Sequence, residues 1–121
     1  MIIALWISGI LLTLVYLLSG VSKTFRSKAA LEPRMAYIED FSTWQVKGIG
    51  VVEILGALGV ILPLATGIAP VITGVAAIGL VIVQVVAIAV HVRRKEGKSV
   101  PVNIVLLLLA VVVAVLRFVT L

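Results

Sequence analysis

The chain has 121 residues, of which 63% are apolar and only 12% are charged, with a formal net charge of +5. Soluble domains are about 45–50% apolar and about 25% charged, so a soluble fold of this length could not hide so much apolar surface, and the composition predicts an integral membrane protein. The absence of cysteine excludes disulfides and thiolate chemistry within the chain. One histidine is too few for a self-contained haem or metal site unless carboxylates or a partner supply the other ligands.

Four apolar segments predict four membrane-spanning helices. The first, about residues 1–22, carries no charged side chain and lacks the basic start and cleavage site of a signal peptide, so we expect a retained helix. The stretch 48–90 is about twice as long as one span needs, and Pro63, Thr66, Gly67 and Pro70 favour a turn within it. It therefore predicts helices at about 47–64 and 69–91. The fourth helix is expected at about 101–120, with Pro101 well placed at its start.

The basic residues predict the orientation of these helices. The second connection, 62–69, has no charge, whereas the other two hold most of the lysines and arginines: Lys23, Arg26, Lys28, Arg34, Lys47, Arg93, Arg94, Lys95 and Lys98. Short loops rich in such residues stay in the cytoplasm. We therefore expect loops 23–47 and 91–101 to be cytoplasmic and both termini to lie outside. This rule accounts for most of the net positive charge of the chain, so nucleic acid is not an expected partner.

The predicted fold is an all-α membrane protein, an antiparallel bundle of four transmembrane helices that forms a single domain over 1–121. Each span carries small and polar residues at spacings of three and four, the period of a packed helix face. The remaining faces are mostly Leu, Ile and Val. The polar connection 24–46 contains aromatic side chains among charges, so we expect it at the membrane interface.

Glu53 is the only acidic residue inside the four apolar segments. A carboxylate in hydrocarbon is expensive, so it normally faces the bundle interior and has a partner or a function. Lys23 lies at a similar depth and predicts an ion pair with Glu53, and His91 could bond to either. Six residues are expected to converge in the cytoplasmic half of the bundle as a ligand-binding or structural polar cluster: Glu53, Lys23, His91, Gln84, Asn103 and Tyr16. No catalytic or metal-binding set is predicted among them.

Several of these residues lie in motifs that resemble the DoxX-like family. The runs are SGVSKTF (19–25), VVEILGALGVILP (51–63), AIAVH (87–91) and a fourth helix that runs from Asn103 to Arg117. Members of that family are small four-helix membrane proteins, named after a subunit of an archaeal terminal quinol oxidase and thiosulfate:quinone oxidoreductase. Some bacterial relatives are linked to membrane oxidoreductase complexes. The resemblance implies a bacterial or archaeal plasma membrane and a redox setting more than a particular reaction.

Three functions remain open from the sequence. The first is a small accessory subunit that stabilises a larger membrane complex or assembles as a homo-oligomer. In this case the polar cluster stabilises the packing of the helices. The second is a binding protein for a quinone or lipid, with the polar head at Glu53 and His91; this chain has no redox centre of its own, so electrons would come from a partner. A transporter component is the weakest of the three. Catalysis by the isolated chain is not expected, because the sequence has no Ser–His–Asp set and no phosphate-binding glycine loop.

Overall fold

The structure is a computed structural model that describes residues 1–26, 41–98 and 100–121. It contains the helices α1 (Ile2–Phe25), α3 (Thr43–Thr66), α4 (Val71–Arg93) and α5 (Val100–Thr120). Each is long and apolar enough to cross a membrane. The prediction of an all-α membrane protein with four spans is therefore confirmed. Most of the connection expected at the membrane interface, 27–40, lies outside the described residues.

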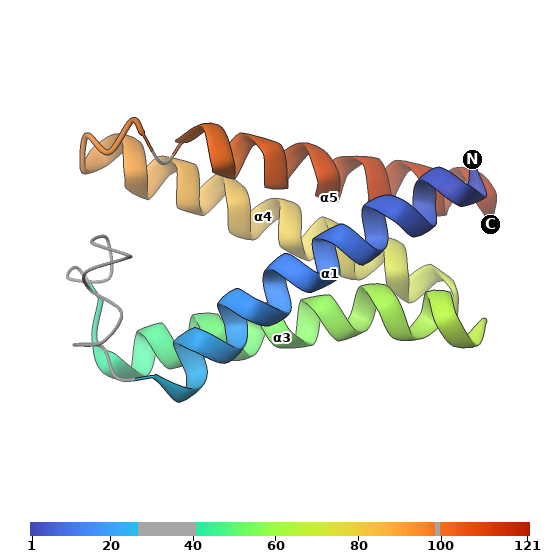
Figure 1. Ribbon diagram of the computed structural model, residues 1–121, viewed down its shortest axis with the longest axis horizontal. Coiled ribbons are helices and arrows are strands. Elements are labelled where there is room, and N and C mark those ends of the chain that lie inside the picture. Colours follow the sequence, from blue (N-terminus) through green and yellow to red (C-terminus); the bar gives the residue numbers. More distant parts are fainter. Residues whose placement is uncertain (27–40, 99) are drawn as a thin grey trace.

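The four helices form an antiparallel bundle in which α1 packs on α3, α3 on α4, α4 on α5, and α5 on α1 (Figure 1). Both chain ends lie at one end of the bundle. We call this the terminal end, where the turn between α3 and α4 also lies. We call the opposite end, which holds Lys23, Lys47 and the turn 94–98, the basic end. Which side of the membrane each end faces stays a prediction.

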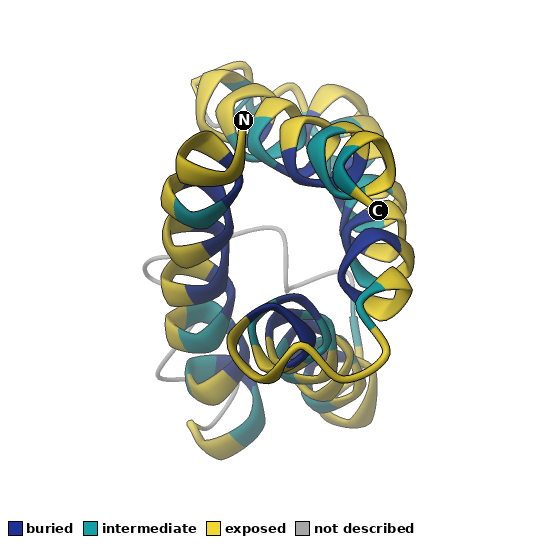
Figure 2. Ribbon diagram, turned by 90° about the vertical axis from the view of Figure 1, so that its right-hand side faces the viewer, coloured by how far each residue is buried: buried dark blue, intermediate teal, exposed yellow. Residues whose placement is uncertain are grey.

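Each helix buries one face and leaves the other exposed. Figure 2 shows the buried parts of the ribbon turned towards the bundle axis, with exposed parts around the outside of all four helices. The core contains Leu5, Leu12, Tyr16, Val60, Leu80 and Val113. The outward faces are Leu, Ile and Val, which suits contact with lipid tails rather than water.

Glycines set how closely the helices approach. A Cβ atom added at Gly50 of α3 would lie 2.7 Å from the carbonyl oxygen of Gly20 in α1, so only glycine fits this contact. Between α3 and α4, a Cβ atom at Gly56 would lie 2.6 Å from Leu80 Cδ2. At Gly50 the two backbones therefore meet directly, and at Gly56 the side chain of Leu80 lies against the α3 backbone, as small residues allow in a membrane. The two contacts hold α3 against both of its neighbours.

The ends of α3 differ from the positions that the sequence suggested. The helix begins at Thr43 rather than at Lys47, because Ser42 and Gln45 form a capping box: the Gln45 amide donates to Ser42 Oγ at 3.1 Å, and the Ser42 amide donates to Gln45 Oε1 at 2.8 Å. At the other end Pro63 lies within the helix rather than in the turn. The helix stops at Gly67, whose φ of 72° is left-handed.

Candidate functional site

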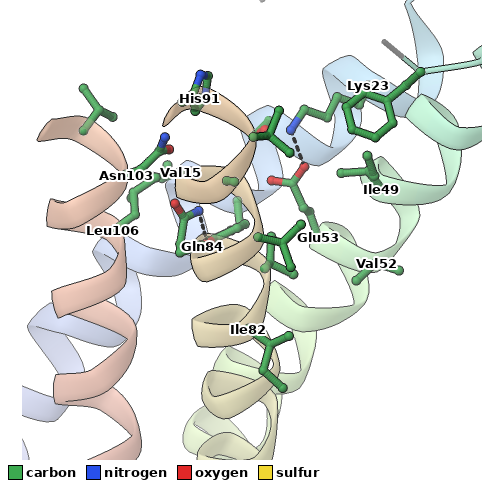
Figure 3. A pocket seen from close by; sticks show the side chains of 18 of the residues that line it. Val15, Lys23, Ile49, Val52, Glu53, Ile82, Gln84, His91, Asn103 and Leu106 are labelled. Atoms are coloured by element: carbon green, nitrogen blue, oxygen red, sulfur yellow. Dashed lines mark hydrogen bonds and ion pairs between the residues drawn. The ribbon is translucent and has the colours of Figure 1, made fainter. Parts of the chain in front are cut away.

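Lys23 and Glu53 form the ion pair that the sequence predicted. Lys23 lies in the last turn of α1 and Glu53 lies on the buried face of α3, and Lys23 Nζ is 2.7 Å from Glu53 Oε1 (Figure 3). The two side chains are only 9% and 4% exposed. Burying two charges is expensive, and only a short, well-aligned contact offsets that cost. The pair joins α1 to α3 in the basic half of the bundle, and its two charges neutralise each other.

Tyr16 and Gln84 form a second buried contact, which joins α1 to α4. Gln84 Nε2 donates to the Tyr16 hydroxyl, and both side chains are buried. The other amide atom, Gln84 Oε1, is buried and has no hydrogen-bond partner among the described residues. The contact therefore uses only part of the hydrogen-bonding capacity of Gln84.

Asn103, one turn into α5, has a similar unused group. Its Nδ2 atom is buried and likewise finds no partner in the described parts of the chain. Gln84 and Asn103 are 4% and 9% exposed, so bulk water does not reach these atoms freely. Leaving a buried donor or acceptor unpaired costs about 1–3 kcal/mol. In native proteins such a group needs an explanation, and an unplaced ligand or water is a common one.

His91 contacts a residue that the sequence analysis did not select. Its Nδ1 atom lies 3.3 Å from Glu96 Oε1, and Arg94 Nε donates to the same oxygen at 3.1 Å. The sequence pointed to Lys23 or Glu53 as partners of His91. Glu96 escaped attention because it follows the end of α4, where helical periodicity no longer says which way a side chain points. The available sequence signal for this contact was the carboxylate of Glu96, five residues after His91.

All six residues that the sequence placed in the polar cluster line one cavity. The cavity has a volume of about 820 Å³ and lies in the basic half of the bundle, with walls from all four helices. Figure 3 shows Lys23 and Glu53 on its α3 side, and Gln84 and Asn103 on its α4–α5 side. Sequence reasoning missed several further lining residues, among them Phe41, Glu96 and Lys98.

The size and lining of the cavity are those of a site for a small organic molecule. Ligand pockets usually measure about 300–1,000 Å³ and have apolar walls with a few polar groups. More than half of the lining residues here are apolar, and valine is the commonest type among them. The charged side chains that line it within the described residues are two lysines, Lys23 and Lys98, and two glutamates, Glu53 and Glu96, so their formal charges cancel. No three His, Cys, Asp or Glu side chains among the described residues are grouped so as to hold a metal ion.

Comparison with known proteins agrees with the motifs. The sequence matches the DoxX-like family over residues 7–113, which includes every residue of the predicted polar cluster. No curated protein and no solved structure matches the chain.

Proposed function

The chain belongs to the DoxX-like family, and from the chemistry of its cavity we propose that it binds a lipophilic molecule with an uncharged polar head, such as a quinone. The tail of this molecule lies between the helices, and its head lies at Gln84 and Asn103. In this proposal the Lys23–Glu53 pair holds α1 and α3 together beside the site and does not bind the ligand.

The observation that carries this proposal is the pair of unsatisfied amides. Gln84 Oε1 and Asn103 Nδ2 are buried and unpaired within the described residues, and both residues line one cavity. A carbonyl oxygen of a ligand can accept from Asn103. Because the Tyr16 hydroxyl can donate as well as accept, the Gln84 amide can offer the cavity either an oxygen or an NH₂ group. Such a site suits a head that carries carbonyl or hydroxyl groups.

The balance of charge supports an uncharged head. Lys23 and Glu53 neutralise each other at 2.7 Å, and Glu96 is held at 3.1 Å by Arg94. Among the described lining residues the remaining cation is Lys98, which is exposed at the basic end. A phosphate or carboxylate beside Gln84 and Asn103 would therefore be a buried charge with no buried cation left to pair with, which is strongly unfavourable. A quinone or a similar neutral amphiphile meets no such obstacle.

An accessory role in a larger membrane complex is a second proposal, compatible with the first. The outward faces of all four helices are rich in exposed Leu, Ile and Val, which suits lipid or the transmembrane helices of a partner. The chain holds no cysteine and one histidine, so electrons for a bound quinone would come from another subunit. Transport is less well supported, because packed side chains such as Leu5, Leu12 and Val113 fill the terminal half of the bundle.

Binding of decylubiquinone to the purified protein in detergent tests the first proposal. Gln84→Leu and Asn103→Leu remove the polar atoms and nearly keep the side-chain volume. We expect each variant to bind about tenfold more weakly, the effect of losing about 1.4 kcal/mol of hydrogen bonding. The matched control is Thr13→Val, because Thr13 Oγ1 is also buried and unpaired within the described residues but does not line the cavity. Absence of binding to the parent protein, or equal affinity in all variants, would contradict the proposal.

A further inference from the structure

The close contacts between α3 and α4 that the described residues show run from the terminal end to the middle of the bundle. Near the terminal end Thr73 Oγ1 donates to the carbonyl oxygen of Val60 at 2.9 Å. One turn further from that end, Gly56 meets Leu80 without room for a Cβ atom. Figure 1 shows the two helices close at this end and separating towards the basic end. The glycine contact therefore marks the point beyond which they part.

Beyond that contact, the residues that would face each other across α3 and α4 line the cavity instead. The next turn brings Glu53 on α3 and Gln84 on α4, and both are lining residues. Figure 3 shows Glu53 between the two helices and Ile82 on the side of α4 that faces α3. The cavity thus occupies the space that packed side chains fill at the terminal end.

Three lining residues of α3 and α4 also belong to the outer surface of the bundle. Val52 of α3 and Ile82 and Val86 of α4 line the cavity, yet they are 53%, 59% and 56% exposed. All three are apolar and lie in membrane-spanning helices, so their exposed atoms face lipid. A side chain that lines a cavity and also faces lipid marks an opening between the two.

We propose that the ligand enters and leaves the cavity sideways through this opening between α3 and α4, directly from the lipid leaflet at the basic end. The inference rests on the proposed function and adds the route and the class of ligand: a molecule dissolved in the membrane rather than a water-soluble one. The apolar side chains Val52, Ile82 and Val86 contact the tail of the entering ligand. Its polar head moves between α3 and α4 to reach Gln84 inside the bundle. Such a ligand never has to cross the charged turn at the end of α4.

The test measures how fast a probe reaches the cavity from a membrane. The protein is placed in phosphatidylcholine vesicles, a photoreactive azido derivative of decylubiquinone is added, and labelled protein is quantified by mass after flashes at set times. In Ile82→Trp the opening is narrowed. We expect the initial labelling rate to fall about tenfold, because entry then requires α3 and α4 to move apart, while the final level stays that of the parent. Ile78→Trp is the matched control, since Ile78 is exposed on the same helix one turn away and does not line the cavity.

Two further measurements separate this route from others. Val102 of α5 also lines the cavity and is exposed, so Val102→Trp narrows the alternative opening beside α5; we expect its initial labelling rate to exceed that of Ile82→Trp. The chain has no native cysteine, so a Val52→Cys/Val86→Cys protein can be bridged with a reversible bifunctional thiol reagent. Bridging should slow labelling, and reduction of the bridge should restore the rate in the same sample.

The outcomes distinguish the route from the binding function. Parent-like rates in both Ile82→Trp and the bridged protein would overturn the route but leave binding intact. A slow rate in Val102→Trp with a normal rate in Ile82→Trp would also overturn it, in favour of entry beside α5. If the parent protein reaches no higher final level than Gln84→Leu, the proposed binding site itself is wrong.

Discussion

Removing either member of the Lys23–Glu53 pair should destabilise the protein far more than removing both. With Nζ and Oε1 2.7 Å apart, Coulomb's law at an effective dielectric constant of about 20 gives an attraction of about 6 kcal/mol. Most of this attraction offsets the cost of burying two charges. Replacing one partner loses the attraction and leaves the other charge buried, which typically costs about 3–5 kcal/mol.

The perturbations are Lys23→Met, Glu53→Leu and the double variant, which together form a double-mutant cycle. We expect each single variant to lose about 3 kcal/mol or more of unfolding free energy. The double variant should be close to the parent or more stable, because apolar residues of similar volume can replace a buried pair without loss. The coupling energy between the two positions is then at least about 3 kcal/mol, well above the range of independent sites.

The assay is reversible unfolding in mixed micelles by titration with sodium dodecyl sulfate, followed by far-ultraviolet circular dichroism. Each variant is compared with the parent at the same protein and detergent concentrations. A double variant that loses the sum of the two single losses would refute the reasoning. In that case the short contact between Lys23 and Glu53 would contribute nothing that the two side chains do not contribute separately.

Three other predictions concern helix packing, helix capping and orientation. Gly50→Ala should lower the unfolding free energy by about 1–3 kcal/mol through overpacking, measured in the same titration. Gly79→Ala is the control and should not lower it, because a Cβ atom added at Gly79 meets nothing within 4 Å. Equal effects of the two substitutions would show that the contact at Gly50 does not limit the approach of the helices. Ser42→Ala should cost about 1 kcal/mol by removing the cap of α3, and an unchanged unfolding midpoint would contradict that role. In intact cells a membrane-impermeant maleimide should label Ile68→Cys, whereas Gly97→Cys should react only after the membrane is opened; the reverse pattern would overturn the predicted orientation.

The number of helices and the faces that they bury could be predicted because lipid simplifies the problem. Apolar length alone decides what spans a membrane, and few polar residues are left to choose from. Glu53 had to find a cation within the bundle, and Lys23 was the lysine at a matching depth. Their pairing therefore follows from composition and helical periodicity, without any knowledge of distances.

The cavity could not be predicted, because it depends on how the helices cross. The separation of α3 and α4 at the basic end follows from close contacts such as Gly56 against Leu80, and a sequence pattern does not say which glycines meet a neighbour. The pairing of His91 with Glu96 lies beyond the helix end, where periodicity stops. The early start of α3 depends on the capping box of Ser42, which precedes the apolar stretch that guided the prediction.

Native mass spectrometry of the protein extracted in mild detergent from its own membrane tests the central claim most directly. We predict that the parent protein carries one small neutral amphiphile, identified by fragmentation, and that a Gln84→Leu/Asn103→Leu protein of unchanged helical content carries none. A parent protein found only at its bare mass, or a double variant that retains the same molecule, would contradict the claim that these two amides hold a ligand in the cavity.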